Sequence, residues 1–246
     1  EMKMINDIYQ ENNEVTKEYN TYEIQQVKPG TYNYFEMYHN VFSTWELKEE
    51  NNMYHHTAFS SCKSFDSFLP KDEFNKYVYD NIQKYLINAV EKRCCTTERP
   101  IACLLSGGLD SSLIAAIVNE YHKKNNLPTL ETYSIGIEGS EDLIYSQKMA
   151  DYLGTNHTQI TLQENDFLDA IPHVIKDIES YDTTTVRASI GNWLIGKYIS
   201  NNSEAKVIFN GDGADELMGG YLYIHQSPNE NEFDKECKSL LRYIHT

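Results

Sequence analysis

A short run of small and polar residues, "LLSGGLDSSL" at residues 104–113, lies between two apolar segments. It supplies adjacent glycines, serine hydroxyls and one carboxylate. Glycines let a backbone approach a ligand closely, and free N–H groups at the start of a helix favour an anion. The run is therefore predicted to bind phosphate. The residues that it would use are Ser106, Gly107, Gly108, Asp110 and Ser111.

The spacing of this run narrows the kind of phosphate chemistry. A Walker A loop needs a longer glycine spacing and a lysine, and a dinucleotide fingerprint needs Gly-x-Gly-x-x-Gly. Neither pattern is present after this apolar run. The pattern Ser-Gly-Gly-x-Asp-Ser is instead typical of the pyrophosphate loop of enzymes that cleave ATP between its α- and β-phosphates. The alternative is a glycine-rich turn with a serine cap and no ligand.

A carboxylate beside a triphosphate is repulsive unless a cation lies between them. Because Mg²⁺ takes oxygen ligands, usually one or two carboxylates plus phosphate oxygens, Asp110 is predicted to bind magnesium. A second acidic run, "NGDGADELMGGY" at 210–221, carries Asp212, Asp215 and Glu216 after another apolar segment. Clustered acids repel one another unless a metal or a cationic substrate holds them. The alternative for this run is a solvated acidic turn.

A third polar run, "ESYDTTTVRAS" at 179–189, lies between the first two. Arg187 has the planar geometry that binds a phosphate or carboxylate through two hydrogen bonds. Taken alone, it is better explained as a surface arginine.

The elements that position these runs form a repeating pattern. Apolar segments at 101–105, 132–137, 157–162 and 206–210 predict buried strands. Helices are predicted from the cap at residues 110–112, and over 142–153, 164–179 and 187–200. Strands that alternate with helices predict an α/β fold, with a mostly parallel sheet and helices on both faces. Ligands bind beyond the carboxyl ends of such strands, where the phosphate loop and the acidic run both lie.

The first 70 residues have a different character. Alternation around Pro29-Gly30 predicts a β-hairpin or a sheet edge over 21–41, and the polar stretch 44–70 predicts a linker. His55, His56 and Cys62 within it are interpreted as linker residues rather than metal ligands. Apolar residues every fourth position from Phe74 to Val90 predict a helix of about 20 residues starting near Pro70.

Composition excludes several classes of protein. The formal net charge of −16 argues against a general binder of nucleic acid or of anionic membranes. No apolar stretch approaches the length of about 18 residues that a transmembrane helix needs, and the N-terminus has no signal-peptide pattern. The odd number of irregularly spaced cysteines predicts free thiols in a reducing, cytoplasmic setting. These are Cys62, Cys94, Cys95, Cys103 and Cys237.

Four segments together carry a family resemblance. "IACLLSGGLDSSLIAA", "YSIGIEGSEDLIYSQKMADYLGTNHTQI", "YDTTTVRASIGNWLIGKYI" and "VIFNGDGADELMGGYLYIHQSPNENEFDKE" resemble, in order and spacing, the synthetase domain of the glutamine-hydrolysing asparagine synthetases. The stretch "VKPGTYNYFEM" is similar to the last strands of that family's amino-terminal glutaminase domain. The implied domains are 1–43 for the end of the glutaminase, 44–70 for a linker and 71–246 for an ATP pyrophosphatase domain that is incomplete at its C-terminus.

The resemblance implies a reaction. The β-carboxylate of aspartate attacks the α-phosphorus of ATP, β-aspartyl-AMP and pyrophosphate form, and ammonia or glutamine-derived ammonia then displaces AMP to give asparagine. Leu104 and Ile135 would flank the adenine and ribose, and Asn210 and Gly211 would contact the nucleotide. The catalytic residues carried over are Thr184, Arg187 and Asp212, and the magnesium ligands are Asp110 and Asp215. Asn210 stands where the family usually has serine, and Asp212 where glutamate is common.

The resemblance also implies a segment of a longer enzyme. The glutaminase nucleophile, a cysteine, would lie upstream of Glu1, and helices with a functional lysine would follow Thr246. The implied partners are aspartate, glutamine or ammonia, and ATP, with neither nucleic acid nor membrane, and a homodimer is compatible with the family. Two alternatives stay open: a related ligase such as a β-lactam-forming synthetase, and a nucleotide-binding paralogue without catalysis.

Overall fold

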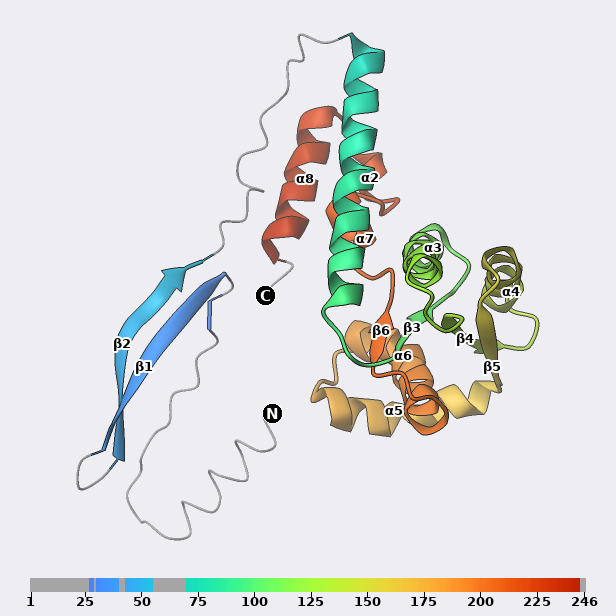
Figure 1. The fold of residues 1–246 in the computed structure, drawn as a ribbon, viewed down its shortest axis with the longest axis horizontal. Helices are drawn as coiled ribbons and strands as arrows, with labels where there is room; N and C mark the ends of the chain where they lie inside the picture. The colour runs from blue at the N-terminus through green and yellow to red at the C-terminus, as the bar shows by residue number, and fades with distance from the viewer. Residues whose placement is uncertain (1–26, 29, 40–42, 55–69, 244–246) are drawn as a thin grey trace. The chain divides into compact units, whose positions relative to one another are not determined.

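The computed structural model describes residues 27–28, 30–39, 43–54 and 70–243 (Figure 1). The chain divides into two compact units. One is Asp66–Met218, and the other combines Glu1–Phe65 with Gly219–Thr246. The phosphate loop, the acidic run up to Met218 and the polar run with Arg187 all belong to the first unit.

A four-stranded sheet in the order β5-β4-β3-β6 forms the centre of the larger unit. All its neighbouring strands are parallel, which confirms the predicted fold class. Leu104 lies beside Tyr133, and Cys103 beside Phe209, so neighbouring strands reach the same edge of the sheet together. The strands are β3 (Ile101–Leu104), β4 (Glu131–Ile137), β5 (Asn156–Leu162) and β6 (Val207–Phe209).

Helices cover both faces of this sheet. Figure 1 shows α3 and α4 on one face and α5 and α6 on the other. Alternate residues of β3 explain the two layers: Cys103 packs into one apolar cluster with α3, and Ala102 into another with α6. The helices are α2 (Lys71–Cys95), α3 (Leu109–Lys124), α4 (Glu141–Leu153), α5 (Glu164–Ile178), α6 (Thr183–Asn202) and α7 (Ala214–Met218).

Two predicted helix starts were wrong in detail. The N-cap of α3 is Gly108 rather than residues 110–112, so Asp110 and Ser111 lie within the first turn. Helix α6 begins at Thr183 rather than at 187, because the Asp182 side chain accepts a hydrogen bond from the backbone N–H of Thr185. The predicted end of α4 is confirmed, since Gly154 adopts a left-handed φ of 69° there.

The smaller unit contains an antiparallel hairpin, β1 (Thr31–His39) and β2 (Ser43–Met53), together with the 3-10 turn η2 (Ile224–Gln226) and helix α8 (Glu230–Tyr243). Strand β2 corrects the sequence analysis, which placed a linker from residue 44. Thr44 and Trp45 of β2 pair with residues of β1. The strand was not predicted because its end, "EENN", is polar like a linker. The predicted turn at Pro29-Gly30 precedes β1, and the observed hairpin joins strands that end at His39 and start at Ser43. Residues 21–26 of the segment predicted to form a hairpin, and His55, His56 and Cys62, lie outside the described residues. The assignment of domains stays a prediction.

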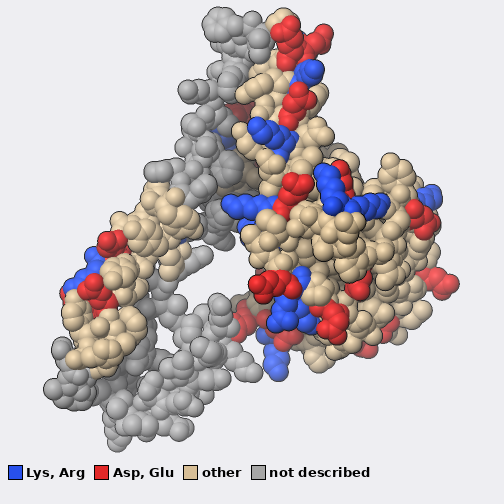
Figure 2. All heavy atoms as spheres, in the orientation of Figure 1, with Lys and Arg blue, Asp and Glu red and all other residues tan. Residues whose placement is uncertain are grey.

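The described helices are all too short or too polar to cross a membrane. Acidic and basic side chains intermingle over the face of the larger unit drawn in Figure 2. Among the cysteines that the structure describes, Cys94, Cys95, Cys103 and Cys237 are free thiols.

Candidate functional site

The phosphate loop and the acidic run meet at the carboxyl edge of the sheet. A Cβ atom on Gly211 would lie 2.7 Å from the backbone N of Ser111 and 2.8 Å from the backbone C of Asp110. A real side chain at Gly211 has no room there, so the glycine allows the loop after β6 to lie directly on the first turn of α3. The two runs that the sequence marked separately are therefore one site.

The phosphate loop is shaped by Gly107. Its φ of +85° is left-handed, and a Cβ there would lie 2.6 Å from the backbone N of Ser146 in α4. Both the backbone conformation and the space require glycine. The first turns of α4 thus form the floor of the loop, which sequence reasoning missed because nothing local in "YSQ" indicates it.

Serine hydroxyls hold the loop in shape. Ser106 Oγ lies 2.9 Å from Ser111 Oγ, which also accepts a hydrogen bond from the backbone N–H of Ser106 at 3.2 Å. The backbone N–H of Gly108 donates to Ser106 Oγ at 3.4 Å. Ser112 Oγ is buried without a hydrogen-bond partner among the described residues. The loop is therefore stabilised by its own side chains.

The start of α3 gives this loop its electrostatic character. The first backbone bond of the helix runs from the N–H of Ser112 to the carbonyl of Gly108. The N–H groups just before Ser112 consequently have no acceptor within the helix. Together with the helix dipole, they favour an anion at this position.

The acidic run adds carboxylates beside that positive helix end. Asn210 Nδ2 donates to Asp212 Oδ2 at 2.6 Å, which fixes the Asp212 carboxylate relative to the end of β6. Asp215 lies one turn further on, in α7. Within the described residues, no three His, Cys, Asp or Glu side chains gather as a metal cage. Asp110 and the acidic run supply carboxylates of the kind that Mg²⁺ uses when phosphate oxygens complete its shell.

Leu104 and Ile135 lie on one face of the sheet. Both are partly buried and pack against the same apolar cluster, which includes Ala102 and Tyr133. Leu105 N–H donates to the Tyr133 carbonyl at 2.8 Å, so β3 and β4 stay paired up to the phosphate loop. The two residues expected beside the adenine are therefore neighbours at the edge that carries the loop.

Thr184 and Arg187 occupy the first turns of α6, where both are exposed. The Asp182 carboxylate caps this helix, and hydrogen bonds from Thr185 hold the pKa of Asp182 below its ordinary value. Within the described part of the chain, Arg187 forms no ion pair. The structure leaves its guanidinium available for an anion but gives no bond from it to the two loops.

A network of polar side chains connects β4, β5 and α4, and the sequence analysis did not predict it. His157 lies between two hydroxyls, with Nδ1 2.9 Å from Thr132 Oγ1 and Nε2 3.1 Å from Ser134 Oγ. Ser134 Oγ in turn lies 3.0 Å from the Oγ of Ser146, the residue that supports Gly107. Burial lowers the pKa of His157. The network joins β4, β5 and the floor of the phosphate loop.

This chain is similar to known proteins over the region that contains the phosphate loop and the acidic run. The family model for asparagine synthase matches residues 81–243. Glutamine-hydrolysing asparagine synthetases are 42% identical in Rattus norvegicus and 43% identical in Homo sapiens, each over 169 residues and 68% of this chain. The synthetase of Gallus gallus is 43% identical over 178 residues, or 72% of this chain.

The match covers much less of the relatives themselves. The chain spans 30% of the length of the rat and human proteins and 32% of the chicken protein. Among solved structures, an NH3-dependent NAD synthetase from Campylobacter jejuni is 17% identical with a TM-score of 0.41, covering 68% of this chain and 73% of that one. Since the family model covers well over half of the sequence and includes the phosphate loop and the acidic run, the chain belongs to the asparagine synthase family.

Proposed function

We propose that this chain provides the ATP-cleaving site of an enzyme that makes asparagine. The observation that carries the proposal is the contact of Gly211 with Asp110 and Ser111, which joins the phosphate loop and the acidic run into one site. Membership of the asparagine synthase family supports the choice of an amide-forming reaction.

The proposed reaction has two steps. A β-carboxylate oxygen of aspartate attacks the α-phosphorus, the bond from that phosphorus to the bridging oxygen breaks, and pyrophosphate leaves. Ammonia, free or released from glutamine, then attacks the acyl carbon of β-aspartyl-AMP, loses a proton, and expels AMP. AMP therefore keeps one oxygen that came from aspartate.

The proposed roles of the site residues combine their positions with the roles that the family resemblance implies. The N–H groups of the phosphate loop and the α3 terminus would receive the leaving pyrophosphate, where fixed dipoles stabilise developing charge. Ser106 and Ser111 would position it, and Leu104, Ile135, Asn210 and Gly211 would hold the nucleoside part. Thr184 and Arg187 would stabilise the adenylate, and Asp212 would act during its formation and use.

Magnesium would be held by Asp110 and Asp215. When bound, it would neutralise the pyrophosphate that leaves. Without a cation, the two carboxylates would repel a triphosphate at this edge. Nucleotide binding is therefore expected to depend strongly on Mg²⁺.

An isotope experiment tests this proposal. Full-length protein is incubated with ATP, Mg²⁺, ammonia and aspartate labelled with ¹⁸O in its β-carboxylate. We expect AMP carrying one labelled oxygen, and unlabelled pyrophosphate. Absence of aspartate-dependent AMP, or label in pyrophosphate, would overturn the proposed reaction. AMP formation with another carboxylic acid alone would favour a relative such as a β-lactam-forming synthetase.

Matched variants test the site. Asp110→Asn and Asp215→Asn are each expected to weaken Mg²⁺-dependent ATP binding and to lower AMP formation at least a hundredfold. Asp151→Asn, a similar change on the exposed side of α4 where Gln147 is its partner, is expected to leave both unchanged. ATP binding without AMP formation in the wild type would instead support a non-catalytic paralogue. Use of glutamine, a homodimer and a cytoplasmic location stay predictions.

A further inference from the structure

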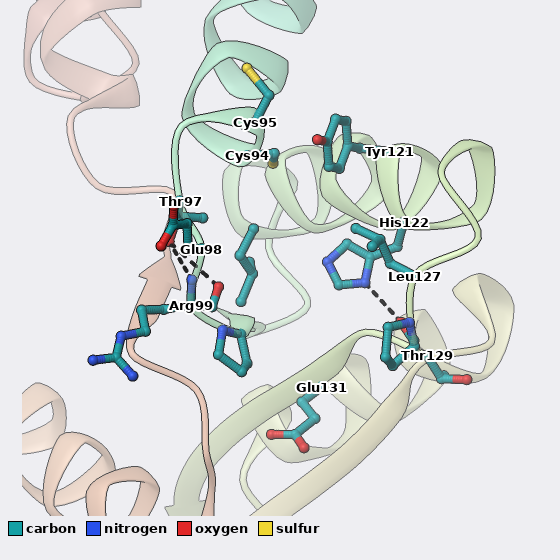
Figure 3. Close-up of a pocket in the computed structure, with 13 residues that line it drawn as sticks. Cys94, Cys95, Thr97, Glu98, Arg99, Tyr121, His122, Leu127, Thr129 and Glu131 are labelled. Atoms are coloured by element: carbon teal, nitrogen blue, oxygen red, sulfur yellow. Dashed lines mark hydrogen bonds between the residues drawn. The ribbon is translucent and has the colours of Figure 1, made fainter.

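A separate hollow lies at the opposite, amino edge of the same sheet (Figure 3). Its volume is about 360 Å³, within the range of small-molecule pockets. The end of α2, the start of β3, the last turn of α3 and the segment leading into β4 form its walls. It shares no residue with the nucleotide site.

The interior of the hollow is mainly apolar. Its walls include Ile101, Leu127 and Pro128, while Glu98 and Arg99 are exposed at the surface. In Figure 3, the Arg99 side chain extends away from the centre of the hollow. Apolar walls do not replace the hydration that a charged ligand would lose inside the hollow.

The other polar groups of the wall are neutral or already bonded. Glu131 Oε2 accepts hydrogen bonds from the hydroxyls of Tyr133 at 2.7 Å and Ser203 at 2.6 Å. Burial raises the pKa of Cys94 to about 11, so its thiol stays uncharged near neutral pH. These contacts favour an uncharged occupant.

His122 is the exception in this wall. It is only 7% exposed. Its Nδ1 lies 2.8 Å from the carbonyl oxygen of Pro128, which can only accept, so Nδ1 carries the proton. In the neutral ring Nε2 is then an acceptor. That atom is buried without a hydrogen-bond partner among the described residues, and Figure 3 shows it on the side of the ring that faces the hollow.

We propose that this hollow binds a small uncharged molecule with an apolar body and one O–H or N–H group, which donates a hydrogen bond to His122 Nε2. A buried acceptor without a partner is costly, and a donor on the ligand would satisfy it. The proposal does not depend on the proposed ATP chemistry.

Two probes that differ by one donor test the inference on the full chain. 2-Naphthol carries an O–H, and 2-methoxynaphthalene has the same rings with the donor methylated. We expect saturable 2-naphthol binding with one site, and about tenfold weaker binding of the methoxy compound. Equal affinity of the two probes, or no binding of 2-naphthol because water alone fills the hollow, would overturn the proposal.

Variants locate the binding. His122→Phe keeps an aromatic ring without the acceptor and should reduce the 2-naphthol affinity about tenfold, removing the difference between the probes. Leu127→Trp should narrow the hollow and weaken both probes. His173→Phe, at an exposed histidine that stacks on Trp193, should change neither. Unchanged discrimination between the probes in folded His122→Phe contradicts the assignment.

A measurement on the wild type keeps the test independent of folding in the variants. Nitrogen NMR of the imidazoles should find His122 as the Nδ1–H tautomer, and 2-naphthol should shift its Nε2 resonance while 2-methoxynaphthalene does not. A proton on Nε2 in the free protein, or an unmoved Nε2 resonance at saturation, would refute the proposed hydrogen bond.

Discussion

The two edges of one parallel sheet differ in the chemical groups that they offer to a ligand. At the carboxyl edge, Gly107 and Gly211 bring backbone against backbone, and free N–H groups lie beside carboxylates. At the amino edge, mainly apolar side chains line a hollow beside the buried imidazole of His122, whose Nε2 has no hydrogen-bond partner among the described residues. We therefore propose a charged nucleotide as the ligand of the first edge and an uncharged molecule as the ligand of the second.

The two edges should differ in how well they tolerate amino-acid substitutions. Backbone-to-backbone contact at the carboxyl edge leaves no atom that is free to move aside. The amino edge is lined by side chains, several of them exposed, which can adjust. Substitutions at the carboxyl edge should therefore cost much more free energy of unfolding than substitutions at the amino edge.

The largest effect is expected for Gly107→Ala. Its left-handed φ alone costs about 1–3 kcal/mol for a residue with a Cβ, and the Cβ would also collide with the backbone of α4. We expect a loss of about 3–5 kcal/mol in the free energy of unfolding, measured with urea, and loss of ATP binding. Gly154→Ala has a left-handed φ of +69° but open space, so it should lose only about 1–2 kcal/mol. Equal losses in the two variants would show that the contact with α4 has no cost.

Gly211→Ala should have the next largest effect. The added Cβ would meet the backbone of Asp110 and Ser111, and such overpacking costs about 1–3 kcal/mol. The two loops would also move apart. The free energy of Mg²⁺-dependent ATP binding should therefore fall by more than the free energy of unfolding does. Gly191→Ala, inside α6 with open space around it, should be neutral or stabilising by up to about 1 kcal/mol. ATP binding by Gly211→Ala at wild-type affinity would contradict the joined site.

The free energy of unfolding should depend on pH through His157, which belongs to the polar network that connects β4, β5 and α4. Burial holds the pKa of His157 below its ordinary 6.5 in the folded state. As pH falls below about 6.5, the unfolded chain takes up the proton and the folded chain resists it, so the free energy of unfolding decreases. His157→Gln should flatten this decrease between about pH 7 and pH 5, whereas His173→Gln should not. Urea unfolding at several pH values measures it, and an unchanged slope in His157→Gln would contradict the assignment.

The smallest effect is expected at the amino edge, for Leu127→Ala. Leu127 is 43% exposed, and its backbone N–H donates to the His122 carbonyl whatever the side chain. The free energy of unfolding should change by about 0.5 kcal/mol or less. A loss as large as that of Gly211→Ala would remove the contrast between the two edges.

Much of the fold was predictable because it depends on local periodicity. Apolar runs such as 101–105 and 132–137 identified the strands, and Gly154 marked the end of a helix. Strand β2 was missed, since its polar end "EENN" resembles a linker and only pairing with β1 makes it a strand. The start of α6 was misplaced because a cap at Asp182 overrode the apolar pattern.

By itself, the sequence determined the phosphate loop, the acidic run and the α/β class, because each is encoded in neighbouring residues whose spacing has a direct chemical meaning. Only the tertiary structure decided that Gly107 rests on α4, that Gly211 lies against Asp110, and that His122 faces a hollow. These contacts join segments distant along the chain. They arise from the strand order β5-β4-β3-β6 and from close packing. Neither can be read from a local segment of the sequence, because both depend on residues far apart along the chain.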